Sequence, residues 1–260
     1  MPRFAANLSM LWPEEDPYDR FRRAAEAGFS RVEMLFPDQL DVDQVEALLH
    51  ELGLEMVLFD PAPGDWAGGE RGLLCLPGRE DEFIASVRDA IALADRLGTR
   101  KLNALAGILP MDASRDDGER TAVANLRAAA RLVEAAGLTL LVEAINSIDM
   151  PGFFADTIER AAALVRAAES PSVCLQLDQY HVAMMGDDPI AALHRYDGLV
   201  RHVQIADLPG RHEPGTGNHP IREFLAELDA TGYDGVVGLE YRPLGSTADS
   251  LSWLAPDARR

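Results

Sequence analysis

Lysine is almost missing from this chain. Of the 24 basic residues only Lys101 is a lysine, and it lies at the start of a strand-like run. Schiff-base catalysis needs an accessible lysine whose pKa is lowered by its surroundings. The near-absence of lysine therefore argues against lysine-dependent aldolase or pyridoxal chemistry.

The chain also has few cysteines, no long apolar run and a negative net charge. Cys75 and Cys174 match no metal-binding spacing and form no disulfide framework, which indicates a reducing cytosol. No apolar run reaches the ~18 residues of a membrane span, and the N-terminus shows no secretory pattern. We therefore expect a cytoplasmic protein with no membrane partner. The net charge of −19 disfavours nucleic acid as a partner, although a local arginine could still hold a small anion.

The chain does contain a regular alternation of predicted strands and helices. Over 260 residues, 47% of them hydrophobic, no linker or shift in composition interrupts it. This pattern predicts an α/β fold, a single (β/α)8 TIM barrel, with residues 1–260 as one domain. A doubly wound open sheet is the alternative, but no glycine-rich dinucleotide turn follows the first strand. The predicted strands are 4–11, 31–35, 54–59, 101–106, 140–143, 173–178, 200–207 and 236–241, and the predicted helices are 17–27, 42–52, 80–97, 115–136, 156–168, 189–195, 221–230 and 249–254.

Four successive strand-like runs carry an oxygen-bearing side chain at or near their C-terminal ends. These side chains are Glu143, Asp178, Gln204 and Glu240. The active site of such a barrel lies at this end, so we expect all four to converge. Three carboxylates and an amide at short range would repel one another without a cation. Mg²⁺ or Mn²⁺ prefers oxygen ligands, whereas zinc would favour His or Cys. The alternative is that each acid is a solvated strand-end residue or a helix cap.

Two glutamates beside a divalent metal indicate a particular chemistry. The metal can stabilise a developing enediolate, while one carboxylate removes an α-proton and the other returns a proton to the neighbouring carbon. Glu143 and Glu240 belong to strands five and eight, which lie across the site from one another. The pattern therefore predicts an aldose–ketose-type isomerase or an epimerase with Glu143 and Glu240 as its catalytic pair.

Four further residues are candidates for substrate binding. His181 follows Asp178 by one helical turn, which favours a substrate contact over a purely structural hydrogen bond. Arg211 suits an anionic or polyhydroxy end of the substrate. Trp66 and Arg71 lie in the long loop 60–78 and could cap the pocket, because irregular loops of this length are often functional.

Several motifs distributed over nearly the whole chain point to one known family. The most specific are His202-Val203-Gln204-Ile205-Ala206-Asp207, the segment 209–217, and Gly238-Leu239-Glu240-Tyr241; segments 28–37, 63–66, 69–72, 77–80 and 151–154 and Asn146 accompany them. With these motifs the chain resembles the hydroxypyruvate isomerase family of the xylose isomerase-like barrel superfamily. The resemblance implies Glu143 and Glu240 as the proton-transfer pair. It also implies Glu143, Asp178, Gln204 and Glu240 as ligands of a divalent metal.

The resemblance leaves the substrate open. The family contains enzymes that interconvert hydroxypyruvate and tartronate semialdehyde, and others that isomerise 2-oxo-tetronate, so we expect a small hydroxy-oxo acid as the substrate. The chain departs from the family pattern near the pocket mouth, at Asp38, Asp60, Ala144 and Leu208. A ketose 3-epimerase and a non-catalytic sugar-acid binding protein remain alternatives, and a homo-oligomer stays open. An endonuclease of the superfamily would need zinc-binding histidines and a basic groove, and the chain offers neither.

Overall fold

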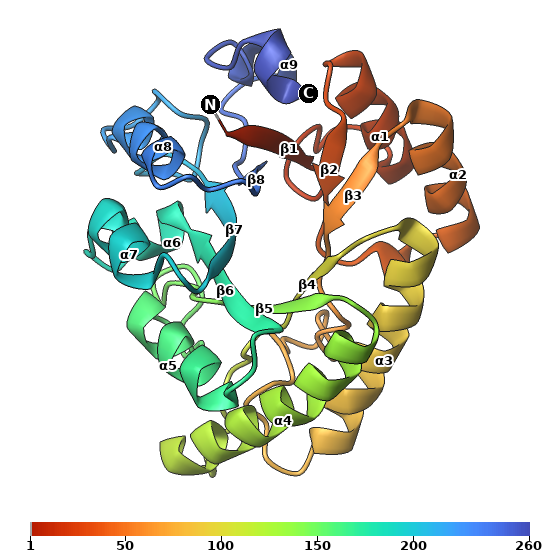
Figure 1. The fold of residues 1–260 in the computed structure, drawn as a ribbon. Coiled ribbons are helices and arrows are strands. Elements are labelled where there is room, and N and C mark those ends of the chain that lie inside the picture. The colour runs from red at the N-terminus through yellow and green to blue at the C-terminus, as the bar shows by residue number, and fades with distance from the viewer. Residues whose placement is uncertain (1) are drawn as a thin grey trace.

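The computed structural model describes residues 2–260, in which eight parallel strands form a central ring surrounded by helices (Figure 1). The strands are β1 (Arg3–Asn7), β2 (Arg31–Glu33), β3 (Glu55–Leu58), β4 (Lys101–Asn103), β5 (Thr139–Glu143), β6 (Val173–Asp178), β7 (Val200–Ile205) and β8 (Val236–Leu239). The α-helices are α1 (Pro17–Glu26), α2 (Val42–Leu52), α3 (Glu80–Leu97), α4 (Arg115–Ala135), α5 (Ile158–Ala168), α6 (Gln179–Met184), α7 (Pro189–Tyr196), α8 (Ile221–Ala230) and α9 (Thr247–Ser250), and two short 3-10 helices are η1 (Pro37–Gln39) and η2 (Pro256–Arg259).

The strands follow the order β3-β2-β1-β8-β7-β6-β5-β4, and the two outer strands of this order meet. Phe59 forms a parallel bridge with Leu102, and the backbone N–H of Asn103 donates to the carbonyl of Phe59 at 3.1 Å. The sheet therefore curls into a barrel, and the (β/α)8 prediction is confirmed. The open-sheet alternative is wrong.

Most predicted helices have the predicted extent because their end signals are local. The side chain of Asp41 caps α2 by accepting from the N–H of Asp43, and Gly53 ends it in the left-handed conformation. Two helical predictions need correction. Helix α5 begins at Ile158, after its cap Thr157, rather than at residue 156, and the last α-helix ends at Ser250 rather than at residue 254. The short helix α6 was not predicted.

Six of the predicted strands are too long at their C-terminal ends, whereas β5 and β6 end at Glu143 and Asp178 as predicted. Strand β1 stops at Asn7, where the chain folds into a turn in which the N–H of Leu11 donates to the Asn7 carbonyl at 2.9 Å. Apolar residues beyond the strand ends are buried all the same, and this burial makes the predicted runs longer than the real strands. Lys101 begins β4, at the opposite end from the loops described below.

The interior of the barrel is filled in layers. The lowest layer is an apolar cluster from strands on several sides of the ring, formed by Ala5, Val57, Leu58, Leu141, Cys174 and Val236. Above it lie buried polar side chains, namely Asn7, Glu33, Asn103, Gln176, His202 and Gln204. The main apolar core fills the space between the strands and the helices. The inside of the barrel therefore becomes polar towards the C-terminal ends of the strands.

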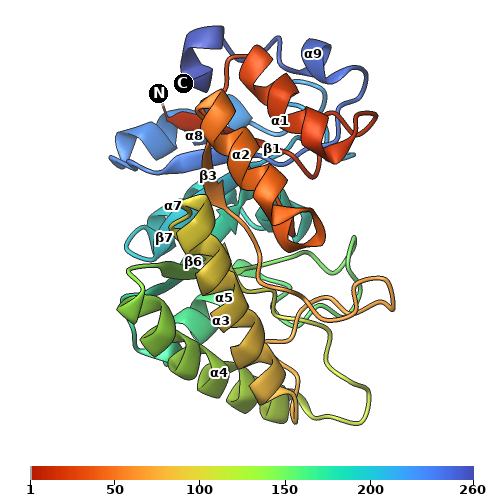
Figure 2. The same ribbon diagram turned by 90° about the vertical axis from the view of Figure 1, so that its right-hand side faces the viewer.

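Long loops project from that C-terminal end. In Figure 2 they extend to the right, and they include the orange segment between β3 and α3. Within residues 2–260, no helix is long and apolar enough to cross a membrane.

Candidate functional site

Three buried carboxylates meet at the C-terminal end of the barrel. Glu143 is the last residue of β5, Asp178 is the last residue of β6, and Glu240 directly follows β8. A single nitrogen of Arg211, Nη2, lies 3.3 Å from Oδ2 of Asp178 and 3.0 Å from Oε2 of Glu240. Arg211 therefore bridges two carboxylates that belong to different strands.

Burial dominates the protonation of this acidic group. It raises the pKa of Glu240 to about 8, although the positive charge of Arg211 opposes the rise. It also raises the pKa of Glu143 well above its usual value, and the charges of Glu240 and Asp178 raise it further. The pKa of Asp178 is raised by burial too, against the effect of Arg211. The positive charge of one guanidinium thus only partly offsets the effect of burial on the three carboxylates.

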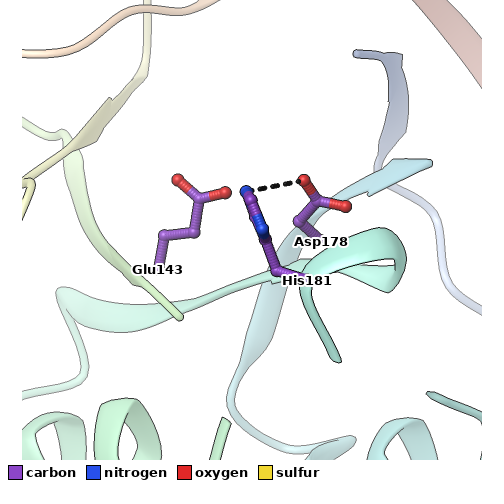
Figure 3. A group of neighbouring side chains, drawn as sticks. All are labelled: Glu143, Asp178 and His181. Carbon is purple, nitrogen blue, oxygen red and sulfur yellow. Dashed lines mark ion pairs between the residues drawn. The ribbon is translucent and has the colours of Figure 1, made fainter. Parts of the chain in front are cut away.

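His181 lies between two of these carboxylates, as Figure 3 shows. Its Nε2 is 3.5 Å from Oδ2 of Asp178, and burial lowers its pKa well below the usual value, so the ring is neutral. Nδ1 accepts from the side-chain Nδ2 of Asn146 at 2.6 Å, since the Oδ1 of Asn146 is used by the N–H of Asp149. The remaining proton therefore sits on Nε2, and His181 points an N–H towards the site.

Gln204 is held from below by the polar layer. Its Nε2 donates to Oε1 of Glu33 at 2.8 Å, and its Oε1 accepts from Nε2 of Gln176 at 2.6 Å. In the sheet, Gln204 pairs with Asp178 on β6 and with Gly238 on β8. The orientation of the amide is therefore fixed, and one lone pair of its oxygen remains free.

Asn103 supports Glu143, and the sequence prediction did not include it. Its Nδ2 donates to Oε2 of Glu143 at 2.9 Å. Asp60 is buried nearby, and its pKa is raised well above the usual value by burial and by the charge of Glu240. The signal used for strands five to eight could not mark Asn103 as a strand end, because the strand-like run continues to residue 106 whereas β4 ends at Asn103.

The loop that carries Arg211 is organised by one buried carboxylate, Asp207. Its two oxygens accept from the backbone N–H groups of Leu208, Gly215, Gly217 and His219, at distances of 2.7–3.2 Å. A β-carbon on Gly217 would lie 1.8 Å from the carbonyl oxygen of Leu208, so the chain packs against itself here. These contacts within the loop therefore hold it in one conformation.

The backbone of Arg211 is itself clamped. It adopts a φ of 59°, which is uncommon for a residue with a side chain, and its carbonyl accepts from the N–H of Arg242 at 2.8 Å. His212 reinforces the clamp, because its Nδ1 lies 2.7 Å from the carbonyl of Arg242. The strained conformation persists because both loops hold it.

Trp66 and Arg71 pack on one another. The guanidinium of Arg71 lies 4.3 Å from the centre of the Trp66 ring, and its Nη1 donates to the Trp66 carbonyl at 2.9 Å. The Trp66 ring meets Phe36 edge-on, with centroids 5.1 Å apart. Across residues 2–260, no recorded hydrogen bond or ion pair joins either residue to the three carboxylates. Their substrate-binding role stays a prediction.

The acidic group has the composition of a cation site. Atoms of Glu143, Asp178 and His181 that could bind a metal all lie within 4.8 Å of one another, and in the tautomer described above the two carboxylates supply the free lone pairs. Buried carboxylates with raised pKa values gain most from a nearby cation, because the cation offsets the energy that burial costs them. A divalent metal therefore fits these residues, and oxygen is their majority donor atom.

The eight parallel strands form a TIM barrel, and its acidic group lies at the C-terminal ends of the strands. Active sites of TIM barrels lie at this end. The family described as "Xylose isomerase-like TIM barrel" matches residues 21–256. The chain belongs to this family.

Two named relatives that match this chain over its length are isomerases. The chain is 41% identical over 256 residues to a 2-oxo-tetronate isomerase of Cupriavidus necator, covering 98% of both chains. It is 39% identical to the hydroxypyruvate isomerase of Escherichia coli, covering 98% of this chain and 99% of the relative. A crystal structure titled as an AP endonuclease, family 2, from Brucella melitensis is 43% identical, with a TM-score of 0.95 and coverage of 98% and 99%.

Proposed function

We propose that this protein is a metal-assisted isomerase of a small hydroxy-oxo acid, either hydroxypyruvate with tartronate semialdehyde or a 2-oxo-tetronate. The observation that carries the proposal is the convergence of Glu143, Asp178 and Glu240 around Arg211 at one end of the barrel. The full-length similarity to two isomerases that act on such acids supports the same class of substrate.

Glu143, Asp178, Gln204 and Glu240 would hold the divalent metal, with Mg²⁺ or Mn²⁺ favoured by their oxygen donors. When bound, the metal would polarise the adjacent carbonyl and hydroxyl oxygens of the substrate. The free lone pair on Gln204 Oε1 supports its place in this set. His181 would instead donate its Nε2–H to a substrate oxygen, because Asn146 occupies its other nitrogen.

The two glutamates would move the proton. Glu143 and Glu240 come from β5 and β8, which are not neighbours in the sheet, so a planar enediolate between them could be approached from two sides. One carboxylate would take the α-proton and the other would return a proton to the adjacent carbon. Asn103 would orient Glu143 through its hydrogen bond. Arg211 would bind the substrate carboxylate, and Trp66 and Arg71 would cover the pocket.

The test is isomerisation followed by NMR in D₂O, with hydroxypyruvate and with 2-oxo-tetronates, in the presence of added Mg²⁺ or Mn²⁺ and after chelation. We expect exchange of the α-proton during turnover, and a loss of about 100- to 10,000-fold in Glu143→Gln and in Glu240→Gln. Glu134→Gln, which changes an exposed glutamate of α4, is the matched control and should retain full activity.

Other outcomes would redirect the assignment. Full activity in either site variant would remove that glutamate from proton transfer. Turnover of a neutral ketose, with none of hydroxypyruvate or a 2-oxo-tetronate, would favour the epimerase alternative. Binding of a hydroxy acid without any exchange of its α-proton would favour a binding protein.

A further inference from the structure

Arg211 holds two of the carboxylates assigned to the metal. We propose that its guanidinium and the divalent cation occupy Asp178 and Glu240 in turn, so that cation binding releases Arg211 to pair with the substrate carboxylate. This inference rests on the proposed function. It adds an order to that function, because the cation would come to the site first and would make the substrate-binding group available.

The contacts of the guanidinium show that its donors are incompletely used. Nη2 alone faces both carboxylates, at 3.3 Å from Asp178 Oδ2 and 3.0 Å from Glu240 Oε2. Nε is buried and has no hydrogen-bond partner. An arginine binds a carboxylate most strongly through a planar pair of N–H groups. The Nε–H and the rest of the fork therefore remain available for a carboxylate that the protein itself does not supply.

Simultaneous occupation by both cations is disfavoured by distance and by charge. Magnesium binds oxygen at about 2.0–2.1 Å, which would bring it close to a guanidinium nitrogen that contacts the same two oxygen atoms. Two positive groups at such a separation repel each other, and they would compete for the same carboxylate oxygens. Among residues 2–260, Arg211 forms the only recorded arginine or lysine ion pairs with these carboxylates. It is therefore the group that a metal would displace.

The displacement needs only a side-chain movement. The backbone around Arg211 is fixed by the bonds that Asp207 accepts and by the N–H of Arg242. The ring of Tyr180 lies 5.1 Å from the guanidinium carbon and gives it an apolar face along which to turn. Arg211 can therefore leave the two carboxylates while its Cα stays in place at the edge of the site.

The test measures Mn²⁺ affinity by calorimetry and by the paramagnetic signal of free Mn²⁺, independently of activity. In Arg211→Gln, which removes the competing cation, we expect Mn²⁺ to bind at least about tenfold tighter, or about 1.4 kcal/mol. The matched control is Arg242→Gln, which removes the same charge from an exposed side chain on the adjacent loop. Its Mn²⁺ affinity should change by less than about threefold. Arg211→Lys, which keeps a cation without the fork, should fall between wild type and Arg211→Gln.

A second experiment tests whether cation binding releases Arg211 from Asp178 and Glu240. Glycerate is an unreactive hydroxy acid, and glycerol is its counterpart without the carboxylate. In the wild type, glycerate should tighten Mn²⁺ binding, and by linkage Mn²⁺ should tighten glycerate binding by the same factor. Glycerol should produce no such coupling. Arg211→Gln should lose most of the coupling with glycerate while binding Mn²⁺ well.

The outcomes separate this inference from the proposed function. Equal or weaker Mn²⁺ binding in Arg211→Gln overturns the exchange, while Mn²⁺ binding by the wild type still leaves the metal site standing. Coupling with glycerate that persists in Arg211→Gln also overturns it. Binding of Mn²⁺ by Arg211→Gln and not by the wild type supports it. Absence of Mn²⁺ binding in wild type and both Arg211 variants overturns the exchange together with the metal-assisted function.

Discussion

Glu33 holds the amide of Gln204 from inside the barrel, with its Oε1 accepting from Nε2 of Gln204 at 2.8 Å. The same carboxylate accepts from Nδ2 of Asn7 at 2.9 Å and lies 2.7 Å from Nε2 of His202. Burial lowers the pKa of His202, although the charge of Glu33 opposes this effect. A carboxylate inside the barrel therefore fixes the orientation of the Gln204 amide.

We expect Glu33→Gln to lower the free energy of unfolding by about 1–3 kcal/mol, because its new NH₂ group would face donors where an acceptor is needed. The affinity for Mn²⁺ should fall about 10- to 100-fold if Gln204 loses its orientation. Denaturant unfolding and a metal titration measure the two effects. Glu55→Gln, at an exposed position of β3, should change neither. Unaltered stability in Glu33→Gln would contradict the prediction.

Gly238 makes room for the same carboxylate. A β-carbon there would lie 2.3 Å from Oε1 and 2.4 Å from Oε2 of Glu33. We therefore expect Gly238→Ala to cost about 1–3 kcal/mol of stability through displaced neighbours, measured by denaturant unfolding. Gly245→Ala is the control, since a β-carbon at Gly245 would meet nothing within 4 Å. Equal stabilities of the two variants would show that Glu33 can move aside freely.

Asp207→Asn should loosen the loop of Arg211. The carboxylate accepts four backbone N–H groups, and an amide would point its own donors at two of them. We expect a loss of about 1–3 kcal/mol, together with faster amide exchange and proteolysis between residues 208 and 219. Asp112→Asn, at an exposed position of another loop, is the comparison. Native-like protection of residues 208–219 in Asp207→Asn would argue that the loop has other support.

Stability should depend on pH through Glu240. Its pKa is about 8 in the folded protein because of burial, against an ordinary value of 4.5 when unfolded. Between these values the folded state binds more protons than the unfolded state, so this group lowers stability as pH rises. In a chelator, Glu240→Gln should gain melting temperature relative to wild type from pH 5 to pH 8. Each kcal/mol corresponds to about 2–4 °C in a chain of this size. A melting difference independent of pH would exclude the raised pKa.

The sequence predicted the barrel well because each helix has local end signals and each strand an apolar run, as for α2 between Asp41 and Gly53. It also brought Glu143, Asp178 and Glu240 to one end of the barrel, since the strand ends must share an edge. It could not predict that Arg211 lies between two of them, because that depends on a φ of 59° and on contacts with a loop 31 residues further along the chain.

Contacts between side chains across the barrel interior could not be predicted from the sequence either. Glu33 and His202 are 169 residues apart, and only closure of the ring brings them together. His202 is buried against Glu33. Glu33 lies at the end of β2, outside strands five to eight, which carry the predicted catalytic and metal-binding residues.

The pairing between neighbouring strands is not equally extensive around the barrel. In the described residues 2–260, seven neighbouring strand pairs are joined by ladders, whereas the segments of β3 and β4 are joined by one bridge, between Phe59 and Leu102. The next residues along these two segments are Asp60 and Asn103, and Asn103 holds Glu143. Local opening of the barrel would therefore begin between β3 and β4. It would first disturb Glu143, on which turnover is proposed to depend.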